Sequence, residues 1–103
     1  MNVHINDKEL IRLYETGSSR KLRLPDDVID KFLATIQKIE SATSIHDFWH
    51  DKGLNFERLK GISNRFSMRL TGSYRLEMEI TWTNTEKTIG DFLIVAISLH
   101  YGR

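Results

Sequence analysis

The chain is 103 residues long, carries a formal net charge of +1 and contains no cysteine. This length fits one domain with one modest core, and the lack of cysteine excludes disulfides, a thiolate nucleophile and a cysteine zinc site. No apolar run approaches the ~20 residues that span a bilayer, and the first ten residues lack the layout of a signal peptide. We therefore expect one globular domain over residues 1–103, located in the cytoplasm and without a membrane partner.

Charge is unevenly distributed along the sequence. Residues 1–51 carry 7 basic and 9 acidic side chains, residues 52–75 carry 6 and 1, and residues 76–103 carry 2 and 4. The middle segment therefore has a net charge of +5, between two segments of −2 each. A basic segment of this kind predicts a local anion-binding face, and a phosphate backbone is the commonest partner of such a face.

The first half of the sequence predicts one short strand and two or three helices. Residues 1–5 favour a strand, and Asn6 or Asp7 can cap a helix that continues to residue 15. Pro25, followed by two aspartates, opens a helix whose apolar side chains recur at helical spacing to about residue 40. A capping pattern at residues 44–47 predicts a further short helix.

His46 and His50 stand four residues apart, a spacing that can bind a metal ion. No carboxylate–histidine motif accompanies them, and two exposed histidines on a short helix are common. We therefore expect no metal and no cofactor.

The second half of the sequence predicts a strand meander. A strand is expected within residues 56–60, and residues 65–70 and 74–82 alternate polar and apolar side chains. The nearly continuous apolar run at residues 92–99 predicts a central strand buried on both faces. Helices followed by such a meander predict an α+β fold, with the N-terminal helices packed on one face of a mainly antiparallel four- to five-stranded sheet.

The register of the central hairpin follows from matching its two faces. A two-residue loop would place Leu70 opposite Arg75, a core side chain against a charge. A three-residue loop at 71–73 instead pairs Leu70 with Tyr74 and keeps the apolar side chains on one face. We predict this second register.

The predicted register has an electrostatic consequence, because it places Arg69 directly opposite Arg75. Like charges that face each other across strands are destabilising by ~0.2–1 kcal/mol. A pair kept at that cost suggests an anionic ligand. The alternative is that Glu77 and Glu79 neutralise the polar face, or that Arg75 pairs with Glu77.

Four short motifs follow one another in the second half of the sequence. They are Lys60-Gly61 in a leucine-lysine-glycine turn, Ser67-Met68-Arg69, Tyr74-Arg75 and His100 at the end of the last strand. With the order of elements, these motifs resemble the RelE/ParE superfamily of bacterial toxins, and within it the HigB branch. The resemblance covers most of the chain, from the helices to the C-terminus. Many HigB proteins end in aspartate-tyrosine-histidine, and here Ser98 stands in place of the aspartate.

This resemblance implies a growth-inhibiting toxin of a type II toxin–antitoxin pair. Such a toxin cleaves messenger RNA on the ribosome and is neutralised by a cognate antitoxin, here of the helix-turn-helix HigA type. Two other functions remain open. The chain could inhibit DNA gyrase by binding, as ParE proteins do, or it could be a non-catalytic module that only binds an antitoxin.

Metal-free RNA cleavage needs a base for the ribose 2′-OH, positive charge at the phosphate and an acid for the leaving 5′-oxygen. We expect Arg69 and Arg75 to grip the phosphate and Lys60 to add a third positive charge. His100 is the best acid or base candidate, and Tyr101 can transfer a proton or stack on a base. The predicted catalytic residues are thus Lys60, Arg69, Arg75, His100 and Tyr101, with Glu57 as a weaker base candidate and Arg58 and Arg65 as RNA-binding residues.

Overall fold

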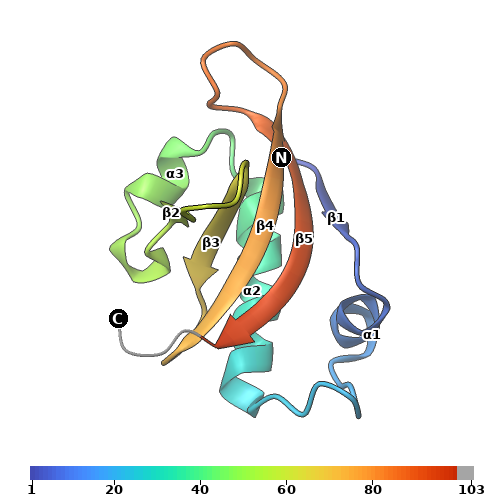
Figure 1. The fold of residues 1–103 in the computed structure, drawn as a ribbon. Helices are drawn as coiled ribbons and strands as arrows, with labels where there is room; N and C mark the ends of the chain where they lie inside the picture. The colour runs from blue at the N-terminus through green and yellow to red at the C-terminus, as the bar shows by residue number, and fades with distance from the viewer. Residues whose placement is uncertain (100–103) are drawn as a thin grey trace.

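The computed structural model describes residues 1–99, which form helices and a five-stranded sheet (Figure 1). The helices are α1 (Lys8–Thr16), α2 (Asp26–Ser41) and α3 (His46–Trp49), followed by a 3-10 turn, η1 (Lys52–Leu54). The strands are β1 (Val3–Ile5), β2 (Glu57–Arg58), β3 (Arg65–Arg69), β4 (Tyr74–Trp82) and β5 (Gly90–Leu99). Within residues 1–99, no helix combines the length and the apolar character needed to cross a membrane.

The strands lie in the order β1-β5-β4-β3-β2. β2 to β5 form the predicted antiparallel meander, and β1 adds to it in parallel, with Val3 opposite Phe92 of β5. The sheet is therefore mainly antiparallel, and the predicted α+β fold class is confirmed.

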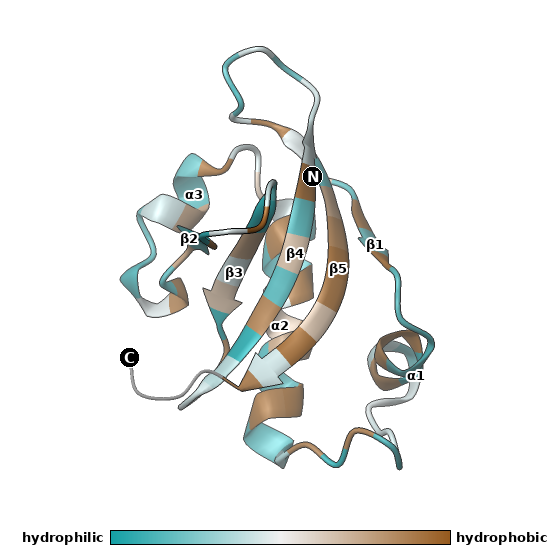
Figure 2. Cartoon of the chain, viewed as in Figure 1, coloured by the Kyte–Doolittle hydropathy of each residue, from teal (hydrophilic) through white to brown (hydrophobic). Residues whose placement is uncertain are grey.

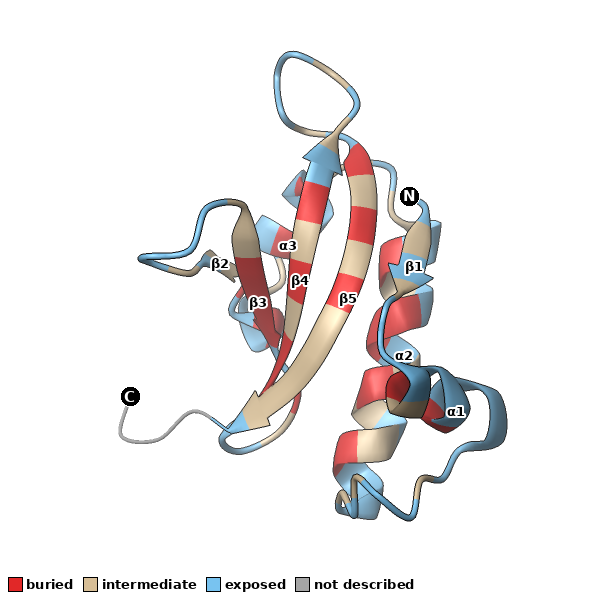
Figure 3. Ribbon diagram, turned by 45° about the vertical axis from the view of Figure 1, so that its right-hand side comes forward, coloured by how far each residue is buried: buried red, intermediate tan, exposed pale blue. Residues whose placement is uncertain are grey.

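One face of the sheet holds the core. Helices α2 and α3 lie on the same side of the sheet (Figures 1 and 3). Phe32 of α2 and Phe48 of α3 are fully buried in one cluster with Met68 and Met78 of the sheet. Because β3 and β4 alternate polar and apolar side chains, their polar residues lie on the opposite face (Figure 2). We call this second face the open face.

The helix boundaries follow from local chemistry. The Asp7 carboxylate accepts hydrogen bonds from the backbone N–H groups of Glu9 and Leu10 at 2.8 and 3.1 Å, which caps α1 as predicted. Gly17, with φ +78°, ends α1 in the left-handed conformation that glycine adopts without a side-chain penalty. Pro25 precedes α2, whose first turn is acidic and therefore favourable to the helix dipole.

Strand β2 is shorter than predicted. It covers two residues of the expected strand at 56–60. The Leu59 N–H still donates to the Arg65 carbonyl at 2.8 Å, but the chain then turns at Gly61 and Asn64, with φ of +83° and +62°. These two left-handed residues end the pairing, because a strand needs extended backbone.

Strand β5 contains a register shift that the sequence pattern hides. Met78 of β4 pairs with Ile94, whereas the next residue, Glu77, pairs with Ala96, so that Val95 is an extra residue in β5. This β-bulge shifts the alternation of the two faces by one residue, so that even-numbered residues face the core before the bulge and odd-numbered residues face it after the bulge. In sequence the run is almost uniformly apolar (Figure 2).

The prediction that this strand is buried on both faces is wrong. Phe92 and Ile94 are fully buried, but residues 95–98 are half-buried and Leu99 is 46% exposed (Figure 3). The phase change at Val95 accounts for Ile97 on the core face, whereas Leu93 and Ala96, which pair with Glu79 and Glu77, are half-buried apolar residues of the open face.

Candidate functional site

The predicted hairpin register is confirmed, and it builds the centre of the site. Arg69 of β3 lies directly opposite Arg75 of β4, and Arg75 lies directly opposite Ser98 of β5. Neighbouring strands are ~4.8 Å apart, so these three residues form one row across the open face. We call it the arginine row.

The loop that joins β3 and β4 has the predicted length. The Leu70 N–H donates to the Tyr74 carbonyl at 3.0 Å, and the Tyr74 N–H donates to the Thr71 carbonyl at 2.9 Å. Gly72 has φ +53° and supplies the left-handed residue that a three-residue loop needs.

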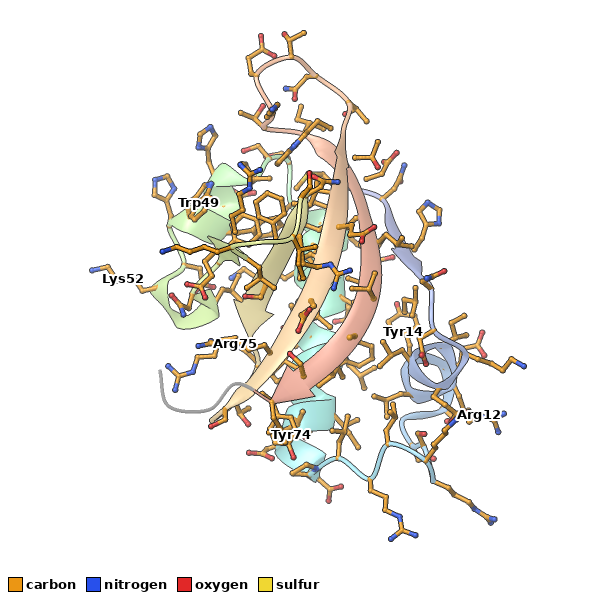
Figure 4. The ribbon with its side chains drawn as sticks, viewed as in Figure 1. Arg12, Tyr14, Trp49, Lys52, Tyr74 and Arg75 are labelled. Atoms are coloured by element: carbon orange, nitrogen blue, oxygen red, sulfur yellow. The ribbon has the colours of Figure 1, made fainter. Side chains whose placement is uncertain are left out.

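Arg75 is a buried cation. Only 9% of its surface is exposed, and it lies beside the C-terminal end of β3 (Figure 4). Its Nε and Nη1 atoms are buried and have no hydrogen-bond partner among residues 1–99, and it forms no ion pair there. Removing a charge from water without a partner is costly, so an anion bound at this guanidinium would be strongly favoured.

Arg69 differs from Arg75 in exposure, since its side chain is open to solvent. It also forms no ion pair within the described part of the chain. The arginine row therefore presents one buried and one exposed cation to the same face.

Arg65, predicted as an RNA-binding residue, forms ion pairs within the sheet. Its Nη1 atom donates to Glu77 at 3.1 Å and its Nη2 atom donates to Glu79 at 3.0 Å. The hydrogen bond to Glu79, with that to Glu77, raises the pKa of Arg65 above its ordinary range. Both glutamates thus bind Arg65, and within residues 1–99 neither of them forms an ion pair with Arg75, so the alternative pairing of Arg75 with Glu77 is not observed there.

The structure does not bring Lys60 to the arginine row. Lys60 follows β2 in the turn next to Arg65, at the opposite end of β3 from Arg69. The two ends of β3 are four residue steps apart, which is about 13 Å along the strand. Lys60 is exposed and lines a surface pocket of ≈ 370 Å³ together with Arg58.

Arg58 and Glu57 project to opposite faces of the sheet. Arg58 pairs with Phe66, a core residue, whereas Glu57 pairs with Ser67 on the open face. Ser67 in turn pairs with Glu77, so that Glu57, Ser67 and Glu77 form a second row beside the arginine row. Glu57 therefore shares a face with Arg69 and Arg75, and Arg58 does not.

Two predicted site residues, His100 and Tyr101, lie outside the described residues. The exposed His46 begins α3 and the exposed His50 directly follows it, on the side of the sheet away from the arginine row. Within residues 1–99, no three histidine, aspartate or glutamate side chains gather closely enough to hold a metal ion.

Two serines of the open face were not predicted as site residues. Ser98 is part of the arginine row, and Ser67 is 1% exposed with a hydroxyl that has no hydrogen-bond partner among residues 1–99. The sequence signal for Ser67 was its place in the Ser67-Met68-Arg69 motif. The signal for Ser98 was its position where many of the HigB proteins that the sequence resembles carry an aspartate, although the bulge at Val95 made its face unpredictable.

The architecture described above is that of the RelE/YoeB-like toxins. A solved structure of a YoeB/ParE toxin from Agrobacterium tumefaciens superposes on this chain with a TM-score of 0.60. The match covers 98% of this chain and 100% of that one at 16% sequence identity. Neither family models nor curated protein sequences match the chain. At this identity the likeness establishes the fold.

Proposed function

We propose that this protein is the growth-inhibiting toxin of a type II toxin–antitoxin pair and that it cleaves messenger RNA on the ribosome without a metal. The observation that carries the proposal is the arginine row, which forms no ion pair within residues 1–99. Arg75 is buried without an ion pair in the described residues, and its direct neighbour is a second arginine. A phosphodiester is the anion that two adjacent guanidinium groups recognise best, because each can donate two parallel hydrogen bonds.

Five residues have proposed roles in this reaction. Arg69 and Arg75 hold the scissile phosphate and stabilise the charge that develops on phosphorus. Glu57 shares their face and is one candidate base for the 2′-OH. His100 follows Ser98 by two residues in the sequence and is the other candidate for proton transfer, with Tyr101 beside it.

Lys60 and Arg58 bind the RNA strand outside the reacting phosphate in this proposal. They line the pocket of the turn between β2 and β3, beyond the reach of the arginine row. Their contribution is electrostatic and independent of the RNA sequence. Loss of Lys60 should therefore weaken binding more than it slows the chemical step.

The partners of this protein are then the ribosome, messenger RNA and a cognate antitoxin. An antitoxin that covers the arginine row would present acidic groups to it. Complementary charge speeds association and makes its rate depend on salt. An association rate that is equal at low and high salt would exclude this face as the docking site.

Induction of the protein in growing cells tests the proposal. We expect growth arrest, and mapped transcript ends that reveal cuts within translated messages. Arg75→Ala and Arg69→Ala should abolish both effects. Lys87→Ala is the control, because Lys87 is exposed in the loop after β4, and β4 ends roughly 23 Å along the strand from Arg75.

Two outcomes would contradict the proposal, and each would indicate a different function. Growth arrest with intact messages and inhibited DNA supercoiling would indicate a gyrase inhibitor of the ParE type. Continued growth in the presence of folded protein would indicate a module that only binds an antitoxin. The A. tumefaciens neighbour is named for both YoeB and ParE, so both assays should be run on the same cultures.

A further inference from the structure

Ser67 lies in the middle of the open face, yet it is only 1% exposed. Its hydroxyl makes no hydrogen bond to any residue of the described part of the chain. Buried hydroxyl groups in proteins are nearly always hydrogen-bonded, because a buried hydroxyl without a partner has lost its hydrogen bonds to water and gained none in the protein. An orphaned hydroxyl on this face therefore indicates a partner that is not part of residues 1–99.

The second orphaned group on the open face is close to the first. Ser67 pairs with Glu77, and Arg75 is two residues from Glu77 on the same strand, so Ser67 and Arg75 are diagonal neighbours. Diagonal residues on one face of an antiparallel pair have Cα atoms about 7–8 Å apart, within reach of a long side chain. Arg75 contributes two unpaired nitrogens and Ser67 one unpaired hydroxyl.

These atoms are all hydrogen-bond donors. The guanidinium can only donate, and the serine hydroxyl can donate one hydrogen bond. A ligand that accepts from both must carry several acceptor oxygens on one small centre, as a phosphate group does. The carboxylate of the neighbouring Glu77 accepts from Arg65, and within residues 1–99 it forms no ion pair with Arg75.

We propose that Ser67 is a phosphate-binding residue, whose hydroxyl donates to one oxygen of a phosphate group while Arg75 donates to the others. This inference rests on the proposed function and extends it, since it names a residue on the buried side of the phosphate site. Arg69, which is exposed, closes the site from the solvent side. Ser67 has no role as a nucleophile here; it binds and orients.

The test uses inorganic phosphate as the probe and the full chain as the sample. The Nε–H signal of Arg75 in a proton–nitrogen NMR spectrum reports binding at this guanidinium directly. We expect phosphate to shift that signal, and Ser67→Ala to weaken phosphate affinity about tenfold, the usual loss for one hydrogen bond to a charged group. The melting temperature of Ser67→Ala should stay the same or rise, because the variant removes an orphaned buried hydroxyl.

Two further variants sharpen the test. Ser67→Thr keeps the hydroxyl and should restore most of the affinity lost in Ser67→Ala. Thr81→Val removes a hydroxyl from an exposed position on the same face of β4 and should leave the affinity unchanged. A loss of affinity in Thr81→Val equal to that in Ser67→Ala would contradict a specific role for Ser67.

The possible failures are distinguishable. If phosphate shifts the Arg75 signal equally in the parent and in Ser67→Ala, the inference about Ser67 is wrong and the proposed function stands. If phosphate leaves the Arg75 signal unchanged in the parent, Arg75 does not bind phosphate, and this contradicts both the inference and the proposed function.

Discussion

Arg69 and Arg75 face each other directly across β3 and β4, and the two guanidinium groups differ in exposure: Arg69 is open to solvent and Arg75 is buried. Water and salt screen the electrostatic repulsion between two exposed like charges. A pair with one buried member is screened far less, so an anion bound there would gain most of its energy from Arg75.

Replacement of Arg75 by alanine should separate activity from stability. Messenger cleavage should fall by about 10²–10³, since one donor to the reacting phosphate is worth about 2.7–4 kcal/mol. Stability should change little, because removal of an uncompensated buried charge offsets the packing lost with the aliphatic stem. Cleavage on purified ribosomes and a thermal melt measure the two effects. A variant that unfolds readily would indicate that Arg75 is structural.

Replacement of Arg65 by methionine should have the opposite effect. Arg65 makes one hydrogen bond to each of two glutamates, and its loss leaves those two carboxylates next to each other on β4. We expect the free energy of unfolding to fall by about 1–2 kcal/mol, which is at the upper end of the range for partly exposed ion-pair networks. Urea denaturation measures this loss. Stability equal to that of the parent would return Arg65 to the list of residues free to bind RNA.

Replacement of Ser98 by aspartate should close the phosphate site. Ser98 lies directly opposite Arg75, so an aspartate there would place a carboxylate within reach of the unpaired guanidinium. Phosphate affinity should fall at least tenfold and the melting temperature should rise, because the new ion pair satisfies a buried charge. Ser98→Asn, which adds the same bulk without charge, is the control. Parent affinity in Ser98→Asp would show that the anion binds elsewhere.

The ion pair between Lys38 and Asp51 predicts a pH dependence. The hydrogen bond from Lys38 lowers the pKa of Asp51 below its ordinary value of 3.8. A carboxyl group with a lowered pKa adds stability above the unfolded value, and this stability disappears as pH falls through the folded value. Asp51→Asn should thus be slightly less stable than the parent at pH 7, by at most about 1 kcal/mol for so exposed a pair.

Thermal melts of both proteins between pH 7 and pH 2 measure this difference. The gap between the two melting temperatures should shrink once pH falls below about 3.8. A gap that is constant across the range would mean that the ion pair does not contribute to folding.

Strict alternation made most of the sheet predictable. Polar and apolar residues alternate along β3 and β4, so the requirement that apolar residues share one face determined the register and placed Arg69 opposite Arg75. The helix α2 was equally clear, because its apolar stripe has a regular helical period. Local patterns of this kind depend on neighbours in the sequence alone.

The remaining features depend on contacts that no local pattern contains. The pairing of Arg65 with two glutamates requires knowledge of which side chains share a face and which rotamers they adopt. The position of Lys60 depends on where the turn after β2 directs the chain. The sequence therefore predicted the correct basic segment but not which of its charges are already neutralised.

The extra residue Val95 has a consequence for any comparison of this chain with its relatives. Because the bulge absorbs one residue without exchanging the two faces beyond it, a related protein could lack that residue and still present the same side chain opposite its arginine. An ungapped alignment of β5 would then equate Ile97, a residue of the core face, with the position that faces Arg75. Only a one-residue gap at Val95 brings Ser98 into the correct column, and with it every residue that follows to the end of the sequence.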